Sequence, residues 1–340
     1  MKHRYRLIII AGLVIMLFVF GQLHIQGPSL PSSPQNTGTQ GRSGDEFMNI
    51  TGILLLGPNT NNRNKRSQTL DQNNDFLYGW IYDISYNSAI KRMNNQSFPL
   101  RIIVENDKYE QHADDFTELD TKLSDDHITL LKDENLGITY THAKAFVGDT
   151  RRAIQTANLN RTSFVENREH FFLSNNPVIR DDLIALFKLD SKKIADPDSV
   201  SASDYQQFLD ESSVNLLVCP LNCREHIENL IRNAHSRIRI SAQYVIDKRI
   251  INLLKQKKNL DIRIRTNNSD SNRDLIRALG QERIIFEDKI YNHDKLLIVD
   301  NTLMIGSMNF SDNALDNNRE IGILLIDPSY IEQVKGLFQK

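Results

Sequence analysis

Residues 293–310 read HDKLLIVDNTLMIGSMNF, and residues 142–159, HAKAFVGDTRRAIQTANL, have the same layout. Each stretch opens with an H-x-K-x4-D pattern, continues with a hydroxyl residue and an Asn two positions later, and is followed by the tripeptide Asn-Arg-Glu. One such pattern could arise by chance, but two copies with identical spacing indicate an internal duplication. The matched residues, always 151 positions apart, are His142 and His293, Lys144 and Lys295, Asp149 and Asp300, Thr156 and Ser307, Asn158 and Asn309, and Glu169 and Glu320.

Segments outside the motifs repeat as well, with less regular spacing. The first copy has an apolar strand pattern at 76–84, a helix near 89–93 and a strand at 100–104, and the second has their counterparts at 237–246, 249–257 and 261–265. Strand and helix signals therefore alternate within each copy, which predicts an α/β fold of two similar lobes. The Asn-rich residues 59–74 stand where the second copy has a helix at 224–234, and we expect a loop there.

The duplication also sets the expected domain boundaries. An apolar N-terminal segment and a Pro/Ser/Gly/Gln-rich stretch precede the first copy, and a polar stretch with Asp-Pro-Asp and several serines separates the copies. The predicted order is a membrane segment or signal peptide at 1–25, a flexible linker at 26–47, lobe 1 at 48–190, a connector at 191–213 and lobe 2 at 214–340.

Composition excludes several classes of protein. Of 340 residues, 40% are hydrophobic and 25% are charged, which is ordinary for a folded globular chain. A mean hydropathy of −0.42 excludes a protein with many membrane spans. The formal net charge is −2 even though Lys2, Arg4 and Arg6 are all basic, which argues against a surface built entirely for nucleic acid. Two cysteines exclude a disulfide-dense scaffold and a four-Cys zinc site.

The N-terminus predicts where the lobes reside. Residues 7–21 carry no polar side chain, and Leu23 and Ile25 extend the run to about the length that spans a bilayer. The basic residues precede this run, so we expect the N-terminus in the cytoplasm and the lobes outside it. A cleaved signal peptide is the alternative, but the best cleavage position, after Gly21, is a poor one. In that case the lobes would be secreted.

The spacing of the motif residues has a chemical meaning. His and Lys two positions apart on a strand would project from one face, and the apolar residues that follow suit a buried strand. Asp149 and Asp300 fall at the expected hairpin turns, so we expect them to be structural. Each lobe thus offers an imidazole, an ammonium, a hydroxyl and a carboxamide, a set that suits a phosphate group.

This duplicated pattern resembles that of the phospholipase D superfamily over approximately residues 50–340. The resemblance implies two lobes related by a pseudo-twofold axis, with both motifs meeting at one site. It further implies that one His attacks phosphorus and forms a phosphohistidine while the other protonates the leaving group. By the usual order of the family, His142 is the nucleophile and His293 the acid.

The remaining roles follow from the same resemblance. The phosphate oxygens would be held by Lys144, Lys295, Asn158 and Asn309, with further hydrogen bonds from Thr156 and Ser307. Glu169 and Glu320 would each orient a histidine. The first copy departs from the family pattern at Gln155, which stands where the second copy has Gly306.

Other residues carry weaker signals. Cys219 and Cys223 could form a small disulfide in an oxidising compartment, or remain as two free thiols. We expect no metal and no cofactor, because neither H-x-K pattern has Cys or carboxylate partners at ligand spacing. Tyr78, Trp80 and Tyr82 alternate along one strand, and core packing explains them better than a substrate platform.

Three functions remain open. The resemblance, together with the predicted membrane segment, implies a metal-independent enzyme that hydrolyses or transfers the phosphatidyl group of a membrane phospholipid. We expect it to act as a monomer because both motifs lie in one chain. The alternative is an extracytoplasmic nuclease that cuts DNA or RNA at the same site. A phosphate-binding surface without catalysis is a third possibility, although both sets of candidate catalytic residues are intact.

Overall fold

The computed structural model describes residues 47–58, 70, 75–106 and 127–339. The predicted membrane segment at 1–25, the linker except Phe47, and the expected loop at 59–74 except Leu70 lie outside the described residues. Among the described residues, no helix has the length and apolar character needed to cross a bilayer.

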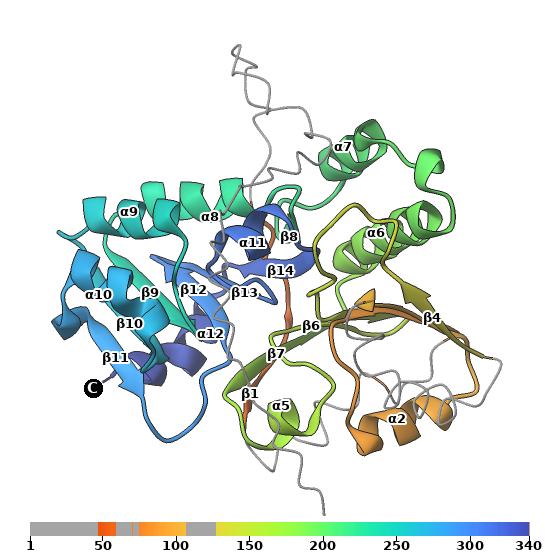
Figure 1. Ribbon diagram of the computed structural model, residues 1–340, viewed down its shortest axis with the longest axis horizontal. Helices are drawn as coiled ribbons and strands as arrows, with labels where there is room; N and C mark the ends of the chain where they lie inside the picture. Colours follow the sequence, from red (N-terminus) through yellow and green to blue (C-terminus); the bar gives the residue numbers. More distant parts are fainter. Residues whose placement is uncertain (1–46, 59–69, 71–74, 107–126, 340) are drawn as a thin grey trace, which may run out of the picture. The chain divides into compact units, whose positions relative to one another are not determined.

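The described residues form two β-sheets, each of seven strands (Figure 1). The strands of the first sheet are β1 (Gly52–Gly57), β2 (Leu77–Ile81), β3 (Leu100–Val104), β4 (Ile128–Lys132), β5 (Ala145–Gly148), β6 (Arg152–Gln155) and β7 (Glu169–Ser174). Those of the second are β8 (Leu216–Cys219), β9 (Arg237–Ala242), β10 (Asp261–Asn267), β11 (Ile284–Glu287), β12 (Lys295–Val299), β13 (Thr302–Gly306) and β14 (Glu320–Leu325).

The strand order shows that the lobes share one topology. The first sheet runs β1-β7-β6-β5-β2-β3-β4, and the second runs β8-β14-β13-β12-β9-β10-β11 when read in the same direction. In both, the three strands at one edge are parallel and the other neighbours are antiparallel. The sequence prediction of two similar α/β lobes is therefore confirmed.

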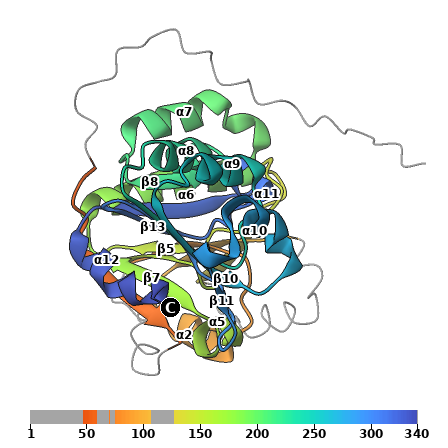
Figure 2. The ribbon, with the colours of Figure 1, turned by 90° about the vertical axis from the view of Figure 1, so that its left-hand side faces the viewer.

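Helices cover the sheets, and the stretch of chain that connects the two lobes is also largely helical (Figure 2). The described α-helices are α2 (Asn87–Asn94), α5 (Arg161–Val165), α6 (Pro177–Ala195), α7 (Ala202–Glu211), α8 (Cys223–Arg232), α9 (Lys248–Gln256), α10 (Arg273–Leu279), α11 (Asp312–Asp316) and α12 (Pro328–Val334). The end of α6 and all of α7 occupy the predicted connector. Asn176 begins α6 by accepting hydrogen bonds from two backbone N–H groups, and Ser201 begins α7 with a capping box.

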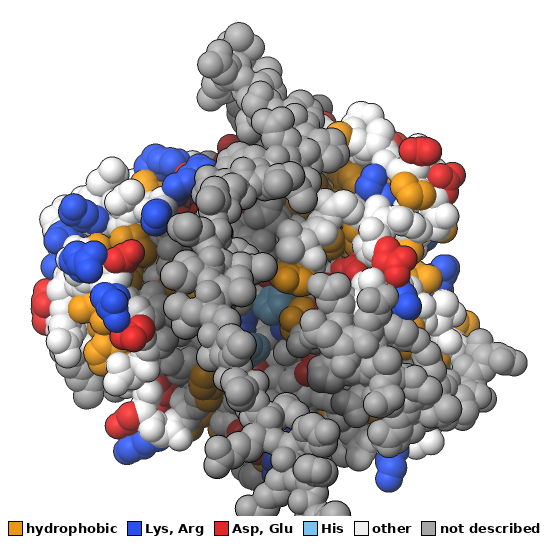
Figure 3. Space-filling view, in the orientation of Figure 1, with side chains coloured by type: hydrophobic (Ala, Val, Ile, Leu, Met, Phe, Trp, Pro, Cys, Tyr) orange, Lys and Arg blue, Asp and Glu red, His pale blue; other side chains and the backbone are white. Residues whose placement is uncertain are grey.

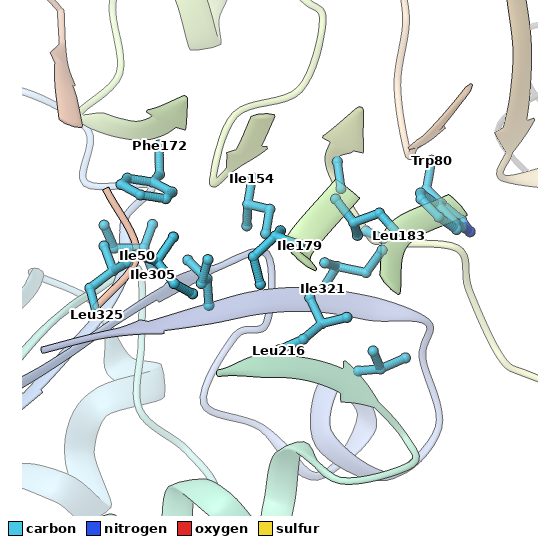
Figure 4. Close-up of a cluster of buried hydrophobic side chains, with 14 of the residues drawn as sticks. Ile50, Trp80, Ile154, Phe172, Ile179, Leu183, Leu216, Ile305, Ile321 and Leu325 are labelled. Atoms are coloured by element: carbon cyan, nitrogen blue, oxygen red, sulfur yellow. The ribbon is translucent and has the colours of Figure 1, made fainter. Parts of the chain in front are cut away.

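The largest buried cluster contains residues of both sheets (Figure 4). Strand β12 shows how this follows from its sequence: Leu296 and Ile298 join this shared cluster, whereas Leu297 and Val299 pack under the helices of lobe 2. A strand covered on both faces must be apolar at every position, as the run LLIV is. In Figure 4, Ile154 of the first sheet lies opposite Ile321 of the second. Both strands of each motif are therefore fixed from two sides.

A buried ion pair also joins the lobes. The guanidinium of Arg319 donates to Asp190 at 3.0 and 2.9 Å, and both side chains are almost completely buried. Trp80 Nε1 and the Tyr205 hydroxyl donate to the same carboxylate at 2.9 and 2.8 Å. Asp190 thus accepts from three side chains that come from three different segments.

This network yields a stability prediction. Asp190→Ala removes the shared acceptor and leaves Arg319 charged and buried, so the free energy of unfolding should fall by about 3–5 kcal/mol. Urea unfolding followed by circular dichroism measures the change. The matched control is Asp181→Ala on the same helix, whose exposed carboxylate pairs with Arg180 and whose loss should cost less than about 1 kcal/mol. Equal losses in the two variants would contradict the structural role of Asp190.

Candidate active site

Each motif histidine lies where the backbone of one lobe pairs with that of the other. His142 N donates to Arg319 O at 3.0 Å, and His293 N donates to Arg168 O at 3.1 Å. The Asn-Arg-Glu tripeptide of each lobe therefore binds the H-x-K segment of the opposite lobe. This corrects the expectation that His and Lys share a strand: β5 begins at Ala145 and β12 at Lys295, because the preceding residues pair across the lobe boundary instead.

Each imidazole is held by a carboxylate of the other lobe. His142 Nδ1 lies 2.9 Å from Glu320 Oε1, and His293 Nδ1 lies 2.7 Å from Glu169 Oε1. Both glutamates are completely buried, whereas both histidine side chains are 14% exposed. Because each carboxylate accepts at Nδ1, the proton of a neutral ring sits there and the lone pair is on Nε2. Sequence spacing predicts one Glu for each His but cannot tell that the partners are exchanged between lobes.

The two motif lysines lie at matched places in the same site. Lys144 Nζ donates to the carbonyl of His142, and Lys295 Nζ donates to that of His293 at 2.6 Å. Burial lowers the pKa of Lys144 to about 7 and that of Lys295 to about 8, although the glutamate carboxylates oppose the change. A bound anion would favour the protonated form of each lysine and so increase the positive charge of the site.

Burial also dominates the charge of the histidines. It lowers the pKa of His142 to about 4 despite the nearby Glu320 carboxylate, and it lowers the pKa of His293 despite Glu169. Both imidazoles are consequently neutral near pH 7 before substrate binds. A neutral ring with its Nε2 lone pair available can act as a nucleophile or a base.

The two asparagines have unsatisfied atoms at matched positions. Asn158 Oδ1 and Asn309 Oδ1 are buried and have no hydrogen-bond partner within the part of the chain that the structure describes. Buried polar atoms are nearly always paired, so such a matched pair marks a place for an external polar group. A carboxamide can present either its oxygen or its NH2 group there, and NH2 suits a phosphate oxygen.

The two hydroxyl residues are placed differently from our expectation of phosphate contact. Thr156 Oγ1 donates to Glu169 and accepts from His170 N at 2.9 Å, and Ser307 Oγ accepts from Ile321 N at 3.0 Å. Both residues are completely buried. Their hydroxyls hold the strands that carry the glutamates, because each lies beside the next strand of its own sheet.

The motif aspartates and the cysteines lie outside the site. Asp300 adopts a positive φ of 50° and accepts hydrogen bonds from the backbone N–H groups at the start of β9, and Asp149 accepts from Asp75 N. A disulfide joins Cys219 and Cys223 between β8 and α8. These residues brace the lobes and do not contact the imidazoles.

Two tyrosines also belong to the site, and the sequence analysis did not place them there. The ring of Tyr82 packs edge-on against His142 with centroids 4.9 Å apart, and the ring of Tyr291 stacks beside His293 at 6.4 Å. Tyr78 and Trp80 do pack in the core as expected, but Tyr82 follows the end of β2 and reaches the site. The alternation of aromatic residues up to a strand end was the only sequence signal for it.

One cavity adjoins His142, and a second is lined by Tyr291, whose ring stacks beside His293. The first, of about 380 Å³, is lined by Tyr82, Tyr140, His142, Tyr244, Ile246 and Asn309, among others. The other, of about 490 Å³, lies in lobe 2 and includes Gln243, Tyr244, Asn267, Lys289 and Tyr291. Figure 3 shows histidine at the bottom of a hollow on this face, between hydrophobic side chains.

Comparison with known proteins finds a family model for most of the second lobe. A family model described as "Cardiolipin synthase, PLD-like domain" matches residues 227–340, which include the second motif. No curated protein sequence matches the chain.

Solved structures resemble both lobes. The chain is similar to phosphatidylserine synthase from Haemophilus influenzae Rd KW20, with a TM-score of 0.63 and 10% identity over 85% of this chain and 87% of the other. It is also similar to polyphosphate kinase from Porphyromonas gingivalis, with a TM-score of 0.60 and 16% identity over 85% of this chain, which spans 50% of that protein. At such identities these likenesses show the fold alone. The family model covers residues 227–340 alone, so the likeness to a phospholipase D-like domain by sequence is shown for that part of the chain.

Proposed function

We propose that the chain is a phosphodiesterase of the phospholipase D type that hydrolyses or transfers the phosphatidyl group of a membrane phospholipid. The observation that carries this proposal is the pair of imidazoles in one site, each with Nδ1 bound by a buried glutamate of the opposite lobe. Two lysines beside them provide donors for a phosphate, and Asn309, which lines the same cavity as His142, can add another through its NH2 group.

In the first step, His142 Nε2 attacks phosphorus. A P–N bond forms as the P–O bond to the head-group alcohol breaks. His293, which takes up a proton on Nε2 when the anionic substrate binds, passes that proton to the alcohol. The lysines neutralise charge on the non-bridging oxygens, and Glu320 stabilises the positive charge that develops on His142.

In the second step, His293 is the base. It takes a proton from water or from an acceptor alcohol, whose oxygen attacks phosphorus and breaks the P–N bond. Water yields phosphatidic acid, and an alcohol yields a new phosphodiester. The same residues serve both outcomes, so the occupant of the space beside His293 decides between hydrolysis and transfer.

The surroundings of the site favour a lipid over a nucleic acid. The rim of the cavities includes Ile246 and Tyr291, which are 40% and 49% exposed although they are large and apolar or aromatic. Among the described lining residues of the two cavities, Lys289 is the one Lys or Arg, and Glu287, Asp288 and Asp312 are acidic. A groove for a polyanionic strand normally carries clustered basic side chains. The predicted N-terminal membrane segment would hold such an enzyme next to its substrate.

The two histidines should fail in different ways. His142→Ala should lower kcat at least about 10³-fold, because the covalent route is lost. His293→Ala should lower it about 10²–10⁴-fold on an alkyl phosphodiester, because the general acid is lost. With bis(p-nitrophenyl) phosphate, whose leaving group needs no acid, His293→Ala should release one equivalent in a burst and accumulate phosphoenzyme, and His142→Ala should not. His235→Ala, at an exposed histidine outside the site, is the control. Trapping of phosphate on His293 would reverse the assignment.

The pH dependence follows from the lysines and from His142. Lysine carries its charge below its pKa, so kcat/KM should fall as pH rises through about 7 to 8, where Lys144 and Lys295 lose protons. On the acid side it should fall near pH 4, where His142 becomes protonated and loses its lone pair. Initial rates across this range measure both limbs, with circular dichroism to confirm that the protein stays folded. A kcat/KM that rises from pH 7 to 9 would be incompatible with this assignment.

The substrate class can be decided in one reaction. The full-length protein in mixed micelles should release head group from labelled phospholipid in the presence of a chelator and leave labelled single-stranded DNA intact. The release should disappear in the His293→Ala variant. Cleavage of DNA with intact lipid would replace the proposal by a nuclease, and cleavage of neither, with phosphate still bound, would indicate a binding surface.

A further inference from the structure

The two halves of the site match in their motif residues but differ directly behind them. The residue between the motif His and Lys is Asp294 in the half that contains His293, and Ala143 in the other half. The residue after the motif Glu is His170 behind His293, and Ile321 in the other half. Charged or titratable groups therefore replace apolar ones in one half of the site only.

These substitutions form a connected buried network. His170 Nδ1 lies 2.7 Å from Asp294 Oδ1, and Ser241 Oγ donates to Asp294 Oδ2 at 2.7 Å. The side chains of His170 and Asp294 are both completely buried. Strand register shows what the other half has at the place of Ser241: Leu296 pairs with Ser241, as Ala145 pairs with Trp80. There Trp80 belongs to the apolar core together with Ala143 and Ile321.

The hydrogen bonds assign a net negative charge to this network. His170 Nε2 is buried and has no partner among the residues that the structure describes. A bare lone pair there costs less than a bare N–H of an imidazolium, so the ring is neutral and donates from Nδ1. Although burial alone would raise it, the pKa of Asp294 lies below its ordinary value because His170 and Ser241 bind the carboxylate.

We propose that Asp294, held by His170 and Ser241, is a positioning residue that keeps Lys295 protonated and makes the His293 half of the site the proton-transferring half. This inference rests on the proposed function. Asp294 precedes Lys295 directly in the chain and belongs to the opposite half from His142. The other half, where Ala143 and Ile321 stand at the matching positions, has no completely buried carboxylate there.

The charged groups around Lys295 support this assignment. Glu169 of β7, Glu320 of β14 and Asp294 attract its proton, while Lys144 and His293 lie close enough to oppose it. The two glutamates act on both lysines, and each lysine has one further carboxylate, Asp294 for Lys295 and Asp83 for Lys144. Asp294 is completely buried whereas Asp83 is only half-buried, so water screens the charge of Asp294 less. Burial lowers the pKa of both lysines, but to about 8 for Lys295 and about 7 for Lys144.

The test compares a variant that loses the charge with one that keeps it. Asp294→Asn preserves the size of the side chain and can still bind His170 and Ser241, but it removes the negative charge. His170→Asn preserves a donor to Asp294 and the charge. The upper step of the alkaline limb of kcat/KM, which belongs to Lys295, should move about one pH unit lower in Asp294→Asn, which is about a tenfold loss on the alkaline side and little loss at pH 6. In His170→Asn the limb should stay where it is in the wild type.

Two results would overturn the proposal. One is an equal loss of kcat/KM at every pH in Asp294→Asn, which a purely structural role would give. The other is a wild-type alkaline limb in that variant. If Asp294→Asn does not fold, the double variant His170→Ile/Asp294→Ala replaces the pair by the residues that the other half accommodates, and the same shift is required of it.

A second measurement separates this inference from the proposed function. Calorimetric binding of inorganic phosphate to the wild type and to Asp294→Asn, between pH 6 and pH 9, requires no turnover. As pH rises, the affinity for phosphate should begin to weaken at a lower pH in the variant than in the wild type. That shift without any phosphodiester cleavage by the wild type would keep the inference and reject the proposed function. Cleavage by the wild type, together with identical binding curves for both proteins, would support the proposed function and reject the inference about Asp294.

Discussion

The exchange of imidazole and carboxylate between the lobes is the contact on which the rest of the structure depends. Neither lobe can orient its own histidine, because the glutamate that binds each ring comes from the other lobe. The backbone pairs that precede the histidines, and the ion pair between Arg319 and Asp190, hold the lobes in the one register in which both contacts form. Folding of the lobe interface and assembly of the site are therefore the same event.

Burial at this interface explains the charge of the site. The same packing that removes water from the histidines and lysines disfavours their charged forms, and the buried glutamates restore only part of the loss. The lysines and histidines of the empty site therefore carry less positive charge than they would in water. An anionic phosphate shifts both lysines toward their charged forms, so the electrostatic stabilisation is greatest when the phosphorus centre carries most negative charge.

Duplication supplies the symmetry, and a few substitutions break it. Two identical half-sites would give each histidine the same tendency to attack or to donate a proton, whereas a covalent displacement needs one of each. Behind one histidine the chain has an apolar cluster with Trp80 and Ile321, and behind the other it has His170 and Asp294. This difference changes the local charge without moving the residues that would contact phosphate.

The sequence alone determined the two-lobed α/β fold and the residues of both motifs, because a spacing of 151 positions repeated six times leaves little freedom. It could not determine which glutamate binds which histidine, since both exchanged and unexchanged pairs fit the same spacing. Thr156 and Ser307 were assigned to phosphate for the same reason: a strand pattern gives the face of a residue but not the neighbour that takes its hydrogen bond. Tyr82, Tyr291 and the pair of His170 with Asp294 also emerged only from the tertiary structure. Their partners lie far away in sequence, and only the packing of the two sheets brings them together.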